Sequence, residues 1–345
     1  MPGSLPALTS AGPTAPLVWI SEALDPAVAE RLSAYRVVPG YGPEGVDFSR
    51  VAGEVEAVIV RAFPFPADLV ESAPRLRVIA RHGVGYDAVA VDTASARGVF
   101  VTNTPGANRY SVAELAIGLL INAFHRLPAA GAVTSKKDAL HHMGKELRDA
   151  VLTIVGAGDI GTETARMASA LGMRVVLAIT PGSSPERVER LCAKARCLDA
   201  EVLPLAEAAA ACDALSVHVP LTPETHHLVD ADLIARMRTD AVVVNTARGG
   251  VVDDRALAGA IREGRLGGAG LDCTEVEPVP ADHELRDLPS VQVLPHIGSL
   301  THQTMRRVGL AAAEAVDDVL SGRTPAHVVN PEAFEVSTVD SMVTK

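Results

Sequence analysis

The sequence has few aromatic residues and no long apolar run. Phe, Trp and Tyr make up 3% of its 345 residues although 48% are hydrophobic, so Ala, Val and Leu must fill a core. The longest apolar run, residues 115–124, is interrupted by Gly118 and Asn122 and is too short to cross a bilayer. This composition excludes a disordered chain and predicts a globular protein without a membrane partner.

Cysteines are also scarce. Cys192, Cys197, Cys212 and Cys273 form no CxxC pair, and no histidine spacing matches a zinc site, so we expect reduced thiols and no bound metal. Residues 1–19 contain neither a basic segment nor a long apolar segment, and therefore do not resemble a signal peptide. These absences indicate a cytoplasmic protein.

Positive charge is in deficit. Lys and Arg number 31 against 42 Asp and Glu, which gives a net charge of −11. Such a surface repels a phosphate backbone and argues against a nucleic-acid partner, while a local basic pocket for a small anion stays open.

The chain does contain short β-branched runs that alternate with helical stretches, which predicts parallel βαβ units. Its length indicates two domains. An apolar helix over residues 111–125 must be covered, either by domain packing or by a second copy of the chain, and residues 136–150 are polar and linker-like. Strands are expected at 17–20, 57–60, 76–80, 99–102, 151–155, 174–179, 214–219, 241–245, 268–271 and 291–294, and the other helices at 26–34, 67–72, 162–171, 230–237, 254–263 and 301–320.

A glycine-rich turn, GAGDIG at residues 156–161, follows the strand expected at 151–155 and precedes a helix. In a dinucleotide-binding turn, Gly156 would permit the tight turn, Gly158 would let the backbone approach a pyrophosphate, and Gly161 would allow close helix–strand packing. The helix N-terminus then offers unpaired N–H groups to the phosphates. We therefore predict a bound dinucleotide.

The acidic residue that would select NAD is missing. Thr180 stands at the end of the next strand, where Asp or Glu would bind the ribose 2′-hydroxyl, and the nearest following cation is Arg187. Because no carboxylate repels a 2′-phosphate, NADP stays open, and because no Arg or Lys follows immediately to attract one, NAD is the first choice.

Three ionisable residues each follow an expected strand: Arg248 in VVVNTARGG, Glu277 in GLDCTEVEPVP and His296 in VLPHIG. Since the carboxyl ends of parallel strands meet at a ligand crevice, we expect the three to meet at the nicotinamide. Reduction of a 2-oxo acid needs an acid of near-neutral pKa, a carboxylate that orients it, and a cation beside the oxygen. Glu275 is a rival for the carboxylate, and the other histidines, including the pairs 141–142 and 226–227, are expected in solvated loops.

These motifs resemble the D-isomer-specific 2-hydroxyacid dehydrogenase family, which includes phosphoglycerate dehydrogenases and glyoxylate/hydroxypyruvate reductases. The resemblance implies two Rossmann-like, doubly wound parallel-sheet α/β domains. The cofactor domain, residues 107–299, would be inserted into a discontinuous substrate domain of residues 1–106 and 300–345. The matching stretches are RHGVGYDAV (81–89), VTNTPGANRYSVAELAIGLL (101–120), IVGAGDIG (154–161), HVPLTPETHHLV (218–229), NTARGGVVDDRAL (245–257), GAGLDCTEVEP (268–278) and PHIG (295–298).

The resemblance also implies residue roles. Arg248 would bind the substrate carboxylate and polarise the keto oxygen, His296 would be the general acid and base, and Glu277 would hold its imidazole. Further contacts are implied with the substrate for Arg61, Val84 and Gly85, and with the cofactor for Gly156, Gly158, Asp159, Ile160, Gly161, Thr180, Val219, Pro220, Thr246, Ala247, Asp272 and Gly298.

The expected activity is reversible hydride transfer between NAD(P) and a small 2-hydroxy or 2-oxo acid, in a homodimer. Arg61 favours a substrate with an anionic 3-substituent, such as 3-phosphohydroxypyruvate. Two alternatives stay open: an NAD(H)-sensing scaffold like the corepressors of this family, and a phosphite dehydrogenase, which has a similar Arg/Glu/His set. Formate dehydrogenases have Gln where Glu277 stands, which argues against that activity.

Overall fold

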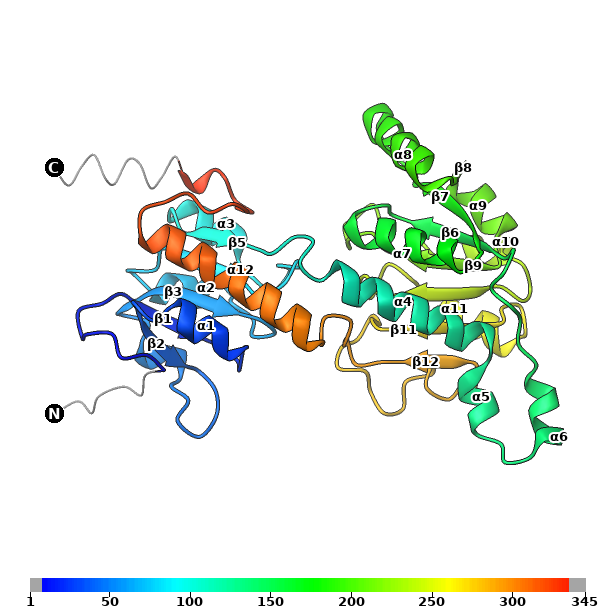
Figure 1. Cartoon of the computed structure of the whole chain (residues 1–345), viewed down its shortest axis with the longest axis horizontal. Coiled ribbons are helices and arrows are strands. Elements are labelled where there is room, and N and C mark those ends of the chain that lie inside the picture. The colour runs from blue at the N-terminus through cyan, green and yellow to red at the C-terminus, as the bar shows by residue number, and fades with distance from the viewer. Residues whose placement is uncertain (1–7, 335–345) are drawn as a thin grey trace. The chain divides into compact units, whose positions relative to one another are not determined.

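The computed structural model describes residues 8–334, and the chain divides into two compact units (Figure 1). One unit comprises Met1–Asn108 and Leu300–Lys345, and the other Arg109–Ser299. The second unit is thus inserted into the first. The outer ends of the expected substrate domain, residues 1–7 and 335–345, lie outside the described residues.

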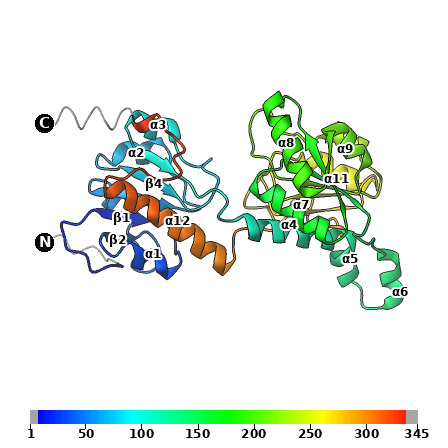
Figure 2. The same ribbon diagram turned by 45° about the horizontal axis from the view of Figure 1, so that its top comes forward.

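The first unit is built on a five-stranded sheet of order β2-β1-β3-β4-β5, in which every strand pair is parallel. Side chains of alternating residues enter two cores. Trp19 packs edge-on against Phe48 and Phe63 on one face, whereas Val18 and Ile59 face the side covered by α1 and α12, which lie side by side (Figures 1 and 2). Its elements are β1 (Leu17–Ile20), α1 (Pro26–Arg31), β2 (Arg36–Pro39), β3 (Val55–Val60), α2 (Ala67–Ser72), β4 (Val78–Arg81), α3 (Val91–Ala96), β5 (Phe100–Thr102) and α12 (His302–Leu320).

The second unit is built on a seven-stranded parallel sheet of order β12-β11-β10-β9-β6-β7-β8. Leu152 and Ile154 face the core under α4 and α7, and Val155 and Leu215 face the core that contains α9 and α11. Its elements are α4 (Arg109–Phe124), α5 (Leu127–Gly131), α6 (Lys136–Ala139), β6 (Val151–Val155), α7 (Asp159–Ala170), β7 (Arg174–Ile179), α8 (Pro185–Leu198), β8 (Glu201–Pro204), α9 (Leu205–Ala211), β9 (Ala214–Val217), α10 (Ala231–Arg236), β10 (Val242–Asn245), α11 (Asp254–Arg262), β11 (Gly268–Leu271) and β12 (Val291–Val293).

Packing within the second unit covers much of the apolar helix that follows Asn108. α4 contacts α7, β10 and β11, and its inward residues are buried. The stretch expected as a linker, 136–150, is not wholly irregular, because it contains α6 and a short 3₁₀ turn. Within the described part of the chain no helix has the length and apolarity needed to span a membrane. All four cysteines are free, as expected.

Candidate active site

The functional residues expected in the second unit stand on loops that follow neighbouring strands. Because all these strands are parallel, their carboxyl ends open on one edge of the sheet, which is where ligands bind in this architecture. The strands and the residues that follow them are β6 with the 156–161 turn, β9 with Val219 and Pro220, β10 with Thr246, Ala247 and Arg248, β11 with Asp272 and Glu277, and β12 with His296 and Gly298.

The glycine turn has the shape that a pyrophosphate requires. Gly156 has a φ of +98°, and a Cβ there would lie 2.8 Å from the carbonyl oxygen of His218. A Cβ on Gly161 would lie 2.0 Å from the carbonyl oxygen of Gly156, so helix and strand touch. By contrast, a Cβ on Gly158 would meet no atom within 4 Å, and no side chain caps α7 there. The first N–H groups of α7, from Asp159 onward, are therefore available to phosphate oxygens.

A small hollow beside this turn is lined by Gly156, Thr180, Ser183 and Arg187. The Thr180 hydroxyl lies 3.1 Å from that of Ser183, and Arg187 is in the first turn of α8. The sequence pointed to Arg187 only as the nearest cation after Thr180; α8, which was not anticipated, places it at the hollow. A signal was present, however: Ser184 caps this helix and Pro185 is its first residue, a typical helix start.

At the carboxyl end of β10, the same edge of the sheet contains a buried polar atom without a partner. Thr246 is 6% exposed, and its hydroxyl has no hydrogen-bond partner among the described residues. A buried hydroxyl without a partner is costly, so a ligand atom at this point would relieve it. Together with the open space at Gly158, this observation shows that the residues present fit a bound dinucleotide.

Glu277 and His296 form a direct pair. Nδ1 of His296 lies 2.8 Å from Oε2 of Glu277. The side chain of His296 is 46% exposed and that of Glu277 is 37% exposed. The hydrogen bond from the imidazole to the carboxylate, with the attraction of opposite charges, raises the pKa of His296 against the effect of burial. Burial opposes ionisation of Glu277, but the His296 hydrogen bond and charge outweigh it and lower the pKa of that carboxyl. With Nδ1 bound to Glu277, Nε2 is the nitrogen left to exchange a proton with a ligand.

The backbone around His296 is held by Asp272. His296 has a φ of +56°, which is uncommon for a residue with a side chain and requires support from its surroundings. Asp272, 1% exposed, accepts the N–H of Ile297 at 2.7 Å and that of Gly298 at 2.8 Å. This supporting role is one that sequence reasoning missed, because it depends on two turns 25 residues apart; the expected contact of Asp272 with nicotinamide stays a prediction.

Arg248 belongs to the same constellation. Its Nη1 donates to the carbonyl of Ala247 at 2.8 Å, and its own carbonyl accepts the side-chain amide of Asn245 at 2.8 Å. The Ala247 carbonyl that accepts this bond also lies 3.5 Å from the sulfur of Cys273, and that sulfur is within 4.8 Å of the ligand atoms of Glu277 and His296, so the guanidinium lies near the pair. The structure therefore brings together the three ionisable residues that the motifs singled out. The rival carboxylate, Glu275, bonds elsewhere.

Cys273 adds a third donor to the pair, which the cysteine spacing did not predict. Its sulfur and the ligand atoms of Glu277 and His296 all lie within 4.8 Å of one another, a group that qualifies as a potential metal site. However, Nδ1 and Oε2 are at hydrogen-bond distance, 2.8 Å, and two ligands of one tetrahedral zinc ion stand about 3.3 Å apart. We interpret the pair as sharing a proton.

The residues expected to contact substrate in the first unit also follow adjacent strands. Arg61 comes directly after β3, and Val84 and Gly85 follow β4. The backbone of Arg61 is fixed by Glu22, whose carboxylate accepts its N–H at 3.1 Å and those of the next two residues at 2.7 Å. Within the described residues, no protein group accepts the N–H of Val84 or Gly85, so both are available to an anion.

Two features define the class of nicotinamide-dependent oxidoreductases. One is a parallel sheet with a dinucleotide-binding turn, and the other is a histidine–carboxylate pair beside an arginine at the same edge of that sheet. Comparison with known proteins gives the family. Residues 117–298 match the NAD-binding domain model of the D-isomer specific 2-hydroxyacid dehydrogenases. The chain belongs to this D-2-hydroxyacid dehydrogenase family, whose members are NAD(P)-dependent enzymes that act on CH–OH groups.

Individual relatives agree with this placement. A glyoxylate reductase of Korarchaeum cryptofilum is 38% identical over 79% of this chain and 82% of its own length. A D-3-phosphoglycerate dehydrogenase of Mycobacterium bovis is 38% identical over 91% of this chain but only 59% of its own length. Among solved structures, the NADPH-dependent glyoxylate/hydroxypyruvate reductase of Sinorhizobium meliloti in complex with NADP and malonate matches with a TM-score of 0.76 and 29% identity, over 93% of this chain and 98% of that one.

Proposed function

We propose that this protein catalyses the reversible NAD(P)-dependent reduction of a small 2-oxo acid to the D-2-hydroxy acid, with a substrate of the phosphoglycerate or hydroxypyruvate/glyoxylate type. The observation that carries the proposal is the 2.8 Å contact between Nδ1 of His296 and Glu277, with Arg248 near the pair. A charged imidazole of raised pKa beside a cation is what the reduction of a carbonyl next to a carboxylate requires.

His296 is the general acid. The bound nicotinamide supplies the hydride for reduction and accepts it in oxidation. His296, held in its charged form by Glu277, gives a proton from Nε2 to the substrate oxygen and takes it back in the reverse direction. Arg248 binds the substrate carboxylate and stabilises charge on that oxygen, an effect whose removal typically costs about 2.7–4 kcal/mol of barrier.

The small hollow beside the glycine turn suits the ribose of either NAD or NADP. The hydroxyls of Thr180 and Ser183 suit a ribose, and Arg187 can pair with a 2′-phosphate, while no carboxylate lines the hollow to repel one. The dinucleotide is held further by Gly156, Gly158, Asp159, Ile160, Gly161, Val219, Pro220, Thr246, Ala247, Asp272 and Gly298. The S. meliloti structure, which contains NADP, supports the second cofactor.

The first unit serves as the substrate domain and supplies further groups for the substrate's anionic parts, and the inserted unit serves as the cofactor domain. The available N–H groups of Val84 and Gly85 support binding of a carboxylate, and the fixed backbone of Arg61 supports a cation at a defined position.

We further propose a homodimer in the cytoplasm, with no nucleic-acid partner. Leu127, Leu140 and Met143 are 47%, 59% and 71% exposed on the segment after α4, and large exposed apolar side chains commonly mark an interface. The free thiols fit a reducing compartment, and the net charge of −11 repels nucleic acid. Light scattering on the purified chain tests the dimer; a monomer at micromolar concentration contradicts it.

A panel of about ten 2-oxo acids, each assayed with NADH and NADPH, tests the activity. Consumption of reduced cofactor with glyoxylate, hydroxypyruvate or 3-phosphohydroxypyruvate is the expected result. Tight NADH binding without turnover of any oxo acid would instead support a cofactor-sensing scaffold. Reduction of NAD by phosphite alone would support a phosphite dehydrogenase.

A further inference from the structure

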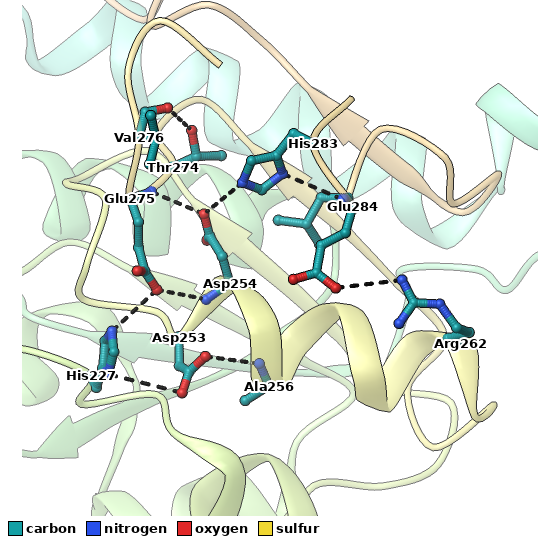
Figure 3. A network of polar contacts seen from close by, with 11 residues as sticks. His227, Asp253, Asp254, Ala256, Arg262, Thr274, Glu275, Val276, His283 and Glu284 are labelled. Carbon is teal, nitrogen blue, oxygen red and sulfur yellow. Dashed lines mark hydrogen bonds and ion pairs between the residues drawn. The ribbon is translucent and has the colours of Figure 1, made fainter. Parts of the chain in front are cut away.

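A second set of ionisable side chains joins the loop before Glu277 to the start of α11 (Figure 3). Its centre is a reciprocal pair. Oε1 of Glu275 accepts the N–H of Asp254 at 3.0 Å, and Oδ2 of Asp254 accepts the N–H of Glu275 at 2.9 Å. Each carboxylate thus bonds the other residue's backbone, which fixes both the separation and the direction of the two segments.

Two histidines lie against the carboxylates of this pair. Nε2 of His227 lies 3.1 Å from Oε1 of Glu275, and Nε2 of His283 lies 3.6 Å from Oδ2 of Asp254. Nδ1 of His283 accepts a backbone N–H from Leu285, so its Nε2 holds the proton that faces Asp254. His227 lies in a turn with its side chain 34% exposed, as expected of a loop residue, but it also contacts the Glu275 carboxylate. Asp254 is only 5% exposed, and this burial raises its pKa to about 6.

The pair connects two loops that each carry a residue of the active site. Asp254 follows Arg248 by six positions, and Glu275 precedes Glu277 by two. The loops also touch through their backbones, because a Cβ on Gly249 would lie 1.8 Å from the carbonyl oxygen of Thr274. The distance between Arg248 and Glu277 is consequently set by contacts that neither residue makes itself.

We propose that Asp254 and Glu275 are positioning residues that hold the Glu277 loop against the Arg248 loop, so that the Glu277 carboxylate meets Nδ1 of His296. The expected effect on turnover rests on the proposed function. The pairing of Glu277 with His296, however, can be measured without turnover. Neither Asp254 nor Glu275 contacts substrate in this account.

The test compares Asp254→Ala, Asp254→Asn and Glu275→Ala with the full-length wild type by NMR titration of the histidines, with His296 assigned by its loss in His296→Asn. Glu277→Gln supplies the pKa of His296 without its carboxylate partner. Asp25→Ala is the matched control: Asp25 caps α1 by accepting the N–H of Ala27 at 3.0 Å, so its loss affects a helix N-terminus in the first unit rather than in the unit that holds the pair.

In Asp254→Ala and Glu275→Ala we expect the His296 pKa to fall toward its value in Glu277→Gln. For an oxo acid that the wild type reduces, kcat should fall by about 10- to 100-fold with NAD(P)H affinity within about twofold of the wild type. Asp254→Asn, which keeps an accepting oxygen, should recover most of both effects, and Asp25→Ala should show neither.

A wild-type His296 pKa in the alanine variants overturns the proposal. If Asp254→Ala fails to fold, Glu275→Ala decides alone, because Glu275 is 35% exposed and its removal leaves no buried gap. Unchanged turnover in Glu277→Gln would contradict the proposed function but not the positioning role of Asp254 and Glu275, which the histidine titration still tests.

Discussion

Replacing Gly249 by alanine tests the contact between the two active-site loops most severely. The added Cβ would lie 1.8 Å from the carbonyl oxygen of Thr274, and real Cβ atoms essentially never come within 3.0 Å of such an atom. The loops must therefore separate by at least 1.2 Å, the difference between these distances. A misplacement of about 1 Å in an active site costs about 10²-fold in rate, or about 2.7 kcal/mol of barrier.

The assay is steady-state consumption of NAD(P)H with an oxo acid that the wild type reduces, together with thermal unfolding and NAD(P)H binding by fluorescence. We expect Gly249→Ala to bind the cofactor normally and to lose about 10²-fold in kcat. The matched control is Gly259→Ala within α11, where an added Cβ meets no atom within 4 Å. This control should retain kcat and gain up to about 1 kcal/mol of stability. A Gly249→Ala variant whose kcat stays within a few-fold of the wild type would refute the reasoning.

The remaining predictions concern the acid, the cofactor and a buried histidine. His296→Ala should lose turnover by about 10²- to 10⁴-fold with near-normal NADH affinity, and rate constants close to the wild type would show that the assigned acid is wrong. Thr180→Asp should shift the kcat/KM ratio toward NAD, whereas Arg187→Ala should weaken NADP more than NAD; an unchanged ratio in both would mean that the 2′ position is bound elsewhere. His82 is 5% exposed, and burial, opposed by backbone hydrogen bonds, lowers its pKa to about 4. Because the unfolded chain then binds the extra proton, the stability contributed by neutral His82 is complete above about pH 6.5 and is lost as pH falls toward 4. From about pH 7.5 to about pH 5 the wild type should lose about 2 kcal/mol more than His82→Leu in urea unfolding, and parallel curves would contradict the shift.

The strands were predictable where buried β-branched runs stand between turn residues. Runs such as LVWI and VLTIV are buried along their whole length because both faces of a parallel sheet are covered. β2 and β8 were not anticipated because they are short edge strands of the two sheets, and β8 has little buried surface. α8 was not anticipated, although Leu191, Ala195 and Leu198 recur at helical spacing and pack against the core of the second unit.

The meeting of the candidate residues at the strand ends was likewise predictable, but their support was not. Strand-end positions and motifs pointed to Arg248, Glu277 and His296, and the structure chooses Glu277 over Glu275 as the partner of His296. Their support comes from hydrogen bonds between segments about 20 or more residues apart in the sequence. One set joins Asp272 to the turn after His296, and the other joins Asp254 to Glu275. Such pairings depend on how the loops pack, which residue type and local spacing do not encode.

The most direct test of hydride transfer at this site is the fate of a deuterium label. Reduced cofactor that carries deuterium at the transferable position of the nicotinamide is incubated with the enzyme and a 2-oxo acid, and the product is analysed by mass spectrometry and on a chiral column. We predict one deuterium at C2 of a D-2-hydroxy acid in the wild type, and labelling that is slower by about 10²- to 10⁴-fold with His296→Ala. Cofactor consumption that leaves C2 unlabelled, or a labelled product formed equally fast by His296→Ala, would contradict the account.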